Sequence, residues 1–141
     1  MEARVGYQMK RAQHALRLRM DGVLRDLGLT TPQYAALSAL EGEPGLSGAS
    51  LARRCFVTPQ TMNQILVNLE SAGLIARRRH PEHGRILQTS LTEKGEGSLS
   101  TAHRLVGEIV RLMVVDLDPQ ERQRLLDMLR RCADALDYEA G

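Results

Sequence analysis

Side chains that both donate and accept hydrogen bonds line one side of the stretch from Thr58 to Gly73. Thr58 can cap a helix, Pro59 suits its first turn, and Gly73 can adopt the left-handed conformation that ends one. Apolar residues at intervals of three and four predict a buried stripe formed by Met62, Ile65, Leu66 and Leu69. The opposite face and its flanks carry no charge and include Gln60, Thr61, Asn63, Gln64 and Val67. Amides, hydroxyls and a small apolar group are suited to base edges in the DNA major groove, so we expect these residues and Thr58 to contact DNA, the alternative being a neutral surface.

An arginine-rich segment follows this helix directly. Residues 75–79 and 85–91 have the composition of two short strands, and residues 80–84 that of the turn between them. Four arginines against one glutamate create a positive field suited to phosphates or to a narrow minor groove. We expect DNA contacts from the strand and turn arginines and from two more on the predicted helix that comes before Thr58, although each could be a solvated charge: Arg77, Arg79, Arg85, Arg53 and Arg54.

Five further helices are predicted around this region. A first helix spans residues 4–27, and a second starts at Thr31-Pro32. Ser47 or Ser50 caps a short third helix, which a tight turn at residues 55–57 separates from the helix at Thr58, as in a helix-turn-helix. A long helix runs from Thr92 to about residue 115, and Asp118-Pro119 starts the last one. The sequence therefore predicts a mainly α-helical fold with a small β-hairpin wing.

Composition limits the class of protein. A chain of 141 residues can bury one core, which must be aliphatic because it has one Phe, three Tyr and no Trp. No apolar run approaches the roughly 20 residues that span a bilayer, so we expect a cytosolic protein without a membrane partner. The net charge of +2 conceals an asymmetry: residues 46–95 hold seven Lys or Arg against three Asp or Glu, and residues 96–141 hold six against nine. The basic character is concentrated on the proposed DNA-binding segment.

The first and last two helices have broad apolar faces that a winged helix-turn-helix alone does not need. Those faces could pack on one another, but the simplest arrangement is that the terminal helices of two chains interleave. A two-fold dimer would also read two half-sites separated by one helical turn of DNA or a multiple of it. We therefore expect a homodimer that binds double-stranded DNA.

With these residues in view, the chain resembles the MarR family of transcriptional regulators. The resemblance extends from about Val5 to Leu136, and its most specific segments are residues 29–34, 51–54, 57–62, 69–75 and 91–95. It implies a winged helix-turn-helix with N- and C-terminal dimerisation helices. The chain is then a single domain of residues 1–141, with dimerisation helices at 4–28 and 92–138 and a DNA-binding lobe at 30–91. The implied function is that of a repressor that binds a pseudo-palindromic operator.

The resemblance also implies regulation by a small aromatic or anionic effector that binds between the dimerisation helices and the DNA-binding lobe. His14, Arg17 and Tyr34 are candidate ligand contacts because they place polar groups near apolar residues on the first two helices; the alternative is a surface or packing role. In the wing, the family pattern Asp-Pro-x-Asp-Arg-Arg is replaced by residues 80–85, with two histidines in place of the acids and Arg85 retained. No other cofactor is expected.

The histidines and cysteines of the chain suggest metal binding, oxidant sensing or catalysis as alternative functions. His80 and His83 supply two ligands where zinc needs three or four, so no metal is expected, but their protonation below about pH 6.5 would strengthen DNA binding. Cys55 and Cys132 could sense oxidants, yet both have the surroundings of small buried residues. No catalytic motif is present, and His14 and His103 have no evident partner, so we expect no enzyme. A helical dimer that binds ligands or proteins without DNA is the last alternative.

Overall fold

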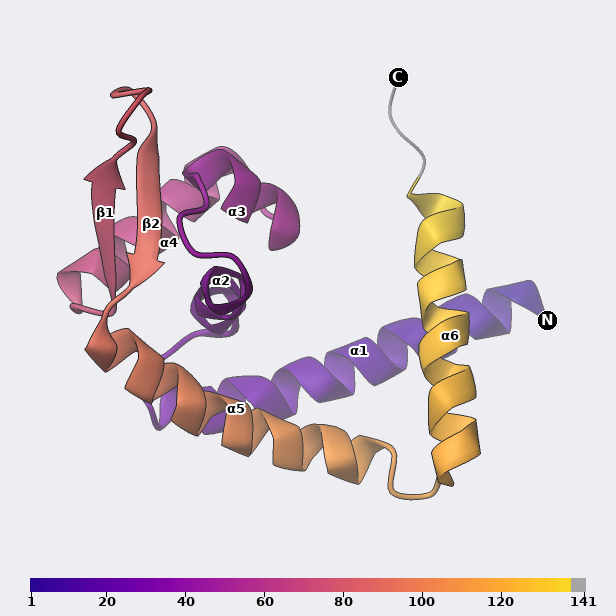
Figure 1. Cartoon of the computed structure of the whole chain (residues 1–141). Coiled ribbons are helices and arrows are strands. Elements are labelled where there is room, and N and C mark those ends of the chain that lie inside the picture. Colours follow the sequence, from indigo (N-terminus) through magenta and orange to yellow (C-terminus); the bar gives the residue numbers. More distant parts are fainter. Residues whose placement is uncertain (138–141) are drawn as a thin grey trace.

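The computed structural model describes residues 1–137 as helices and one two-stranded hairpin. In chain order the elements are α1 (Glu2–Arg25), α2 (Thr31–Gly42), α3 (Gly48–Arg54), α4 (Pro59–Ser71), β1 (Ile75–Arg79), β2 (Leu87–Leu91), α5 (Glu93–Met113) and α6 (Pro119–Leu136). Helices α2, α3 and α4 form one lobe with the hairpin, while α1, α5 and α6 extend away from it (Figure 1). The predicted fold class is confirmed. Residue 138, the last of the expected dimerisation segment, lies outside the described residues.

Short polar side chains cap the helix starts from α2 to α6. The five caps are Thr30, Ser47, Thr58, Thr92 and Asp118, and each side chain accepts a hydrogen bond from the backbone N–H three residues on. Helix α2 begins at Thr31, as expected, but Thr30 is its cap and not Thr31. The Thr30 backbone N–H donates to Gln33 Oε1 at 3.0 Å, which completes a capping box.

The hydrophobic core lies where α2, α3 and α4 meet the end of α1 and the first half of α5. The predicted stripe of α4 is buried, and it packs with Leu24, Leu37, Leu40, Leu51 and Leu99. These leucines are 0–1% exposed, so the lobe holding α4 is anchored on both long helices. Among the described residues, none before Leu24 and none after Val106 is buried.

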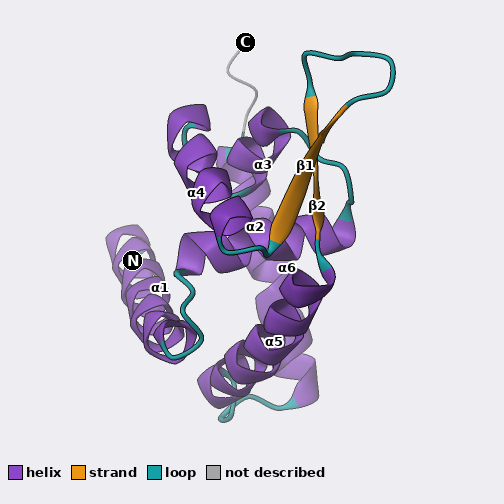
Figure 2. Cartoon of the chain, turned by 90° about the vertical axis from the view of Figure 1, so that its left-hand side faces the viewer, coloured by secondary structure: helices purple, strands orange, loops and turns teal. Residues whose placement is uncertain are grey.

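The hairpin pairs antiparallel beside α4, with its loop extending beyond the helices (Figure 2). The register joins Ile75 to Leu91 and Arg79 to Leu87, and Leu46 adds a single bridge to Thr89 on the far side of β2. The second strand was expected from residue 85, but it begins at Leu87. Residues 85 and 86 belong to the loop, because Ile86 donates a hydrogen bond to the carbonyl oxygen of His83 at 2.8 Å.

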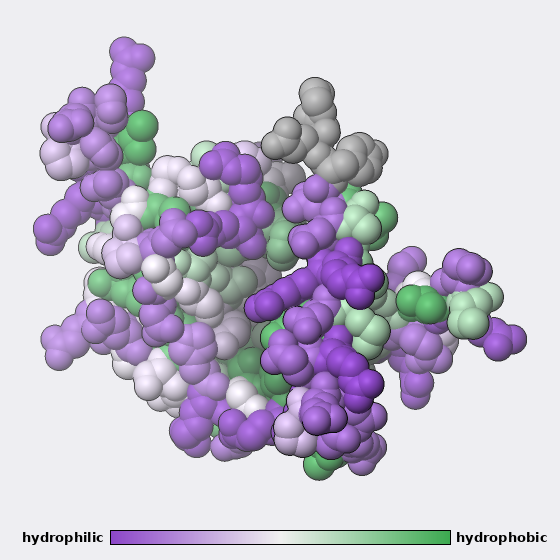
Figure 3. Space-filling view, turned by 45° about the vertical axis from the view of Figure 1, so that its right-hand side comes forward, coloured by the Kyte–Doolittle hydropathy of each residue, from purple (hydrophilic) through white to green (hydrophobic). Residues whose placement is uncertain are grey.

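The first two-thirds of α1 and all of α6 remain uncovered in a single chain. The apolar row of α6 consists of Leu125, Leu129, Cys132 and Leu136. Leu125 is half-buried and the other three are exposed, with Leu136 at 79%. The expectation that Cys132 is buried was therefore wrong for one chain, because α6 has no extended packing against another described element. Apolar side chains are visible among the charged ones on this side of the molecule (Figure 3). Within the described part of the chain, no helix has the length and apolarity that crossing a membrane requires.

Candidate nucleic-acid interface

The turn between α3 and α4 places the N-terminus of α4 at the surface of the lobe. Phe56 in this turn has a φ of 58° and is 94% exposed, so the chain accepts a left-handed non-glycine residue to change direction here. Thr58 then caps α4 at 3.1 Å from the Thr61 backbone nitrogen, and the two threonine hydroxyls are 3.0 Å apart. The start of α4 is thereby fixed by side chains from within the predicted site.

The outer face of α4 presents hydrogen-bonding groups without charge. All the predicted contact residues of this helix are exposed: Gln60, Thr61, Asn63, Gln64 and Val67. Gln64 donates from its amide nitrogen to Asn68 Oδ1 at 3.1 Å, which aligns the two amides along the helix. The buried stripe faces the core behind them, so the helix separates a packing side from a side that is free to recognise another molecule.

The wing arginines occupy two different environments. Arg79 and Arg85 are exposed, as a contact with a phosphate requires. Arg77 is only 16% exposed in its side chain and forms an ion pair with Glu70 at 3.2 Å, which braces the hairpin against α4. Its Nε atom is buried without a hydrogen-bond partner. The contact predicted for Arg77 remains a prediction, and the structure gives this residue a positioning role beside it.

A groove of about 310 Å³ separates α4 from the wing. Its walls come from the start of α3, from α4 and from the hairpin, and they include Ser47, Asn63, Arg77, Arg85 and Thr89. Three of the predicted site residues, from two elements and the wing loop, thus converge on one concave surface. The lining residues of the groove include two guanidinium groups and no carboxylate. Because Arg77 is paired with Glu70, the positive charge that favours an anionic partner comes mainly from Arg85.

The two arginines of α3 are exposed. Arg53 donates to Ser50 Oγ at 3.2 Å, and Arg54 forms an ion pair with Glu43. Arg53 therefore keeps its net charge available, whereas the charge of Arg54 is partly neutralised within the lobe.

The three candidate ligand contacts have different surroundings. His14 is exposed on α1, and Arg17 pairs with Asp21 at 3.0 Å. Asp21 also accepts a hydrogen bond from the Thr31 hydroxyl, and this bond, together with Arg17, lowers the pKa of the Asp21 carboxyl. A cavity of about 370 Å³ between α2, β2 and α5 is lined by other residues, including Glu41 and Glu96.

Tyr34 instead joins a polar link between α2 and α5. Its hydroxyl lies 2.7 Å from His103 Nδ1, and His103 Nε2 lies 3.0 Å from Glu41 Oε1. Burial raises the pKa of the Tyr34 hydroxyl. The expectation that His103 has no partner was wrong. Its partners are 69 and 62 residues away in the chain, so no local spacing could indicate them.

Comparison with known proteins decides the family. Residues 27–86 match the sequence model of the MarR family. The HTH-type transcriptional repressor Rv2887 of Mycobacterium tuberculosis is 38% identical over 131 residues, which cover 91% of this chain and 94% of the relative. The chain belongs to the MarR family. The resemblance inferred from its sequence is confirmed.

Solved MarR-family structures share the fold. Rv2887 in complex with salicylic acid superposes with a TM-score of 0.74 at 35% identity, covering 90% of this chain and 94% of that one. The same protein in complex with DNA gives 0.75 at 33% identity, covering 90% and 95%. The transcriptional repressor CouR bound to a 23-mer DNA duplex gives 0.82 at 31% identity, covering 91% of both chains. In this MarR-family chain, α3 and α4 are the helix-turn-helix and β1–β2 is the wing.

The described residues of this MarR-family chain contain no group of three or more His, Cys, Asp or Glu that could hold a metal ion. The names of its relatives describe transcriptional regulators. Cys55 is half-buried, and burial raises the pKa of its thiol. A sensor cysteine needs the opposite shift, because the thiolate is the reactive form. This disfavours Cys55 as an oxidant sensor.

Proposed function

We propose that this chain is a transcriptional repressor that binds a pseudo-palindromic operator as a homodimer and releases it when a small aromatic or anionic effector binds. The observation that carries the proposal is the uncharged amide face of α4 beside a groove lined by Asn63, Arg77 and Arg85. Amides recognise bases, and arginines attract phosphates. Family membership and relatives solved on DNA support it. As a regulator of this kind, the protein works in the cytoplasm.

Dimer formation follows from the uncovered helices. The apolar residues left exposed on α1, on the end of α5 and on α6 need a cover, and a second copy supplies it with the same elements. In such a dimer the two copies of α4 enter major grooves about 34 Å apart or a multiple of that. Sedimentation equilibrium of the full chain tests this step, and a monomer at micromolar concentration would contradict it.

DNA binding is tested with fluorescence anisotropy on a duplex from upstream of the coding region. Gln64→Ala should weaken binding by about 1–3 kcal/mol and relax specificity at one base position, because it removes an amide from the reading face. Arg85→Ala should weaken binding to all sequences and reduce the salt slope by about one. Arg104→Ala is the matched control, since Arg104 is an exposed arginine of α5. Helix α5 lies at the opposite end of the lobe from the wing tip (Figure 1).

The result that overturns the proposal is a Gln64→Ala, Arg85→Ala double variant that binds the duplex as tightly as the parent. A DNA affinity of the parent that hardly changes with salt concentration would also overturn the proposal. A dimer that neutralises several phosphates loses orders of magnitude in affinity as the salt concentration rises.

Effector release is the regulatory part of the proposal. A relative solved with salicylic acid supports an aromatic carboxylate as the first ligand to test. His14, Arg17 and Tyr34 remain the proposed contacts. An effector that prefers another spacing of the two α4 helices weakens DNA binding only by its differential affinity, typically 1–3 kcal/mol. Salicylate titrated into the DNA complex should raise the apparent Kd, and His14→Ala, Arg17→Ala and Tyr34→Phe should reduce that effect.

A further inference from the structure

The loop at the tip of the wing is organised by one imidazole. His80 Nδ1 lies 3.0 Å from the backbone nitrogen of Glu82 and 3.1 Å from that of His83, so it accepts from two N–H groups. The backbone N–H of His80 donates to the Ile86 carbonyl oxygen at 2.8 Å, and Ile86 N–H donates to the His83 carbonyl oxygen at 2.8 Å. Within this loop, the side chain of residue 80 thus fixes the backbone that carries Arg85.

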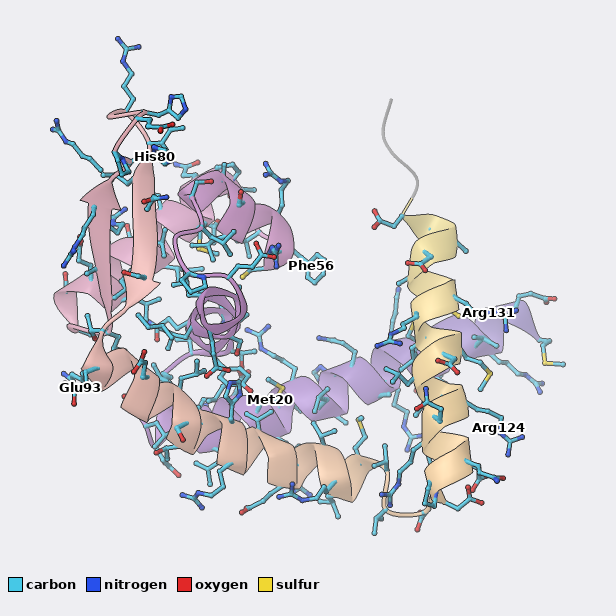
Figure 4. The ribbon with its side chains drawn as sticks, viewed as in Figure 1. Met20, Phe56, His80, Glu93, Arg124 and Arg131 are labelled. Atoms are coloured by element: carbon cyan, nitrogen blue, oxygen red, sulfur yellow. The ribbon has the colours of Figure 1, made fainter. Side chains whose placement is uncertain are left out.

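We propose that His80 is the positioning residue of the wing: its Nδ1 atom closes the loop and thereby holds Arg85 in place for DNA. The effect on DNA binding rests on the proposed function, whereas the closure of the loop does not. Figure 4 shows His80 where β1 ends and the loop begins, which is the point from which a single side chain can control the whole tip.

The hydrogen bonds specify the protonation state that this role requires. A nitrogen that accepts from two N–H groups carries no proton of its own, so the imidazole proton lies on Nε2. A doubly protonated imidazole has a donor at both nitrogens, and it would release the amides of Glu82 and His83. The closed loop therefore exists only while His80 is neutral.

The charged and titratable groups around His80 belong to the loop and to the adjoining strand end. They are Arg79, Glu82, His83 and Arg85, and the centroid of the His83 ring lies 5.0 Å from that of His80. The His83 side chain accepts no backbone hydrogen bond among the described contacts, so the two histidines differ in role. His83→Ala is for that reason the matched control for His80→Ala.

The loop is tested first without DNA, by following the backbone amides of Glu82 and His83 with ¹⁵N NMR. In the parent, both amides should be protected from exchange with solvent at pH 7. In His80→Asn that protection should be kept, because the Asn Oδ1 atom occupies the place of Nδ1 and accepts from the same two N–H groups. In His80→Ala both amides should exchange with solvent faster at pH 7. Amides that remain as protected in His80→Ala as in the parent overturn the inference.

The second arm measures DNA affinity at pH 7.5, where added charge plays no part. His80→Ala should weaken binding about fivefold, the equivalent of one net hydrogen bond, while His80→Asn and His83→Ala keep parental affinity. Parental affinity in His80→Ala together with freed amides overturns the positioning role. Arg85→Ala then separates the cases: if this variant also binds like the parent, the wing does not contact DNA, and the proposed function fails at that point.

Discussion

The junction between the wing and α5 leaves no room for a side chain at Gly95. A Cβ atom built there would lie 2.0 Å from the Leu74 carbonyl oxygen and 3.0 Å from its carbon, both of them backbone atoms. Three hydrogen bonds hold the same junction: Thr92 N–H to Leu74 O at 3.1 Å, Thr92 Oγ1 to Gly73 O at 2.6 Å, and Lys94 Nζ to Ala72 O at 2.9 Å. They bind the end of α4 and the start of β1 to the first turn of α5.

Gly95→Ala should destabilise the fold because this junction has to open. Real Cβ contacts are essentially never shorter than 3.0 Å, so α5 must move away from Leu74. Overpacking of this kind costs about 1–3 kcal/mol, and the loss of the Thr92–Leu74 hydrogen bond adds about 1 kcal/mol. The higher helix propensity of alanine offsets at most about 1 kcal/mol of this destabilisation. The free energy of unfolding should therefore fall by about 1–3 kcal/mol.

The measurement is urea unfolding followed by circular dichroism at one fixed protein concentration, since association makes stability depend on concentration. Gly97→Ala is the matched control, because it lies two residues further along α5, where an added Cβ meets no described atom within 4 Å other than its neighbours and the backbone of its own helix. It should be as stable as the parent or up to about 1 kcal/mol more stable. If Gly95→Ala unfolds at the same urea concentration as Gly97→Ala, the close approach of α5 to Leu74 does not exist.

Three further predictions concern individual side chains. Phe56→Gly should raise the free energy of unfolding by about 0.5–1 kcal/mol, because Phe56 is exposed and has a φ of 58°; an unchanged urea midpoint contradicts this. Tyr34→Phe removes the 2.7 Å bond to His103 and should cost about 0.5–1.5 kcal/mol in the same assay; an unchanged free energy of unfolding contradicts a stabilising role for this bond. Burial raises the pKa of the Cys55 thiol, so this thiol stays protonated to a higher pH in the folded chain than in the unfolded chain. The stability of the parent should therefore decline more steeply than that of Cys55→Ser above pH about 8.5, where an unfolded thiol ionises, and parallel pH curves would exclude the shift.

Local sequence signals predicted α4 well. Thr58 and Pro59 mark its start, and the intervals of its apolar residues define its buried side, because caps and periodicity act within one or two turns. The left-handed glycine at its end was equally predictable, and Gly73 has a φ of 77°. The exposure of the predicted α4 contacts follows from the same pattern.

Contacts between distant segments were not predictable in this way. His103 finds Tyr34 and Glu41 only when α5 packs on α2, and nothing near any of them in sequence indicates the others. Cys132 was assigned to a buried row because α6 has an apolar side, but periodicity shows which side is apolar and not what covers it. The start of β2 was placed two residues early because Arg85 and Ile86 have strand-like composition, whereas the hydrogen bonds of the wing loop include them in the turn.

The absence of charge on the outer face of α4 has a consequence for how such a regulator chooses among sites. The attractive force of the proposed interface comes from arginines on α3 and the wing, and these act alike on every duplex. Neutral amides discriminate between one base pair and another, and ions in solution hardly screen the contacts of these amides. A change in the cell's ionic strength would then alter occupancy at all sites together and leave their order of preference intact.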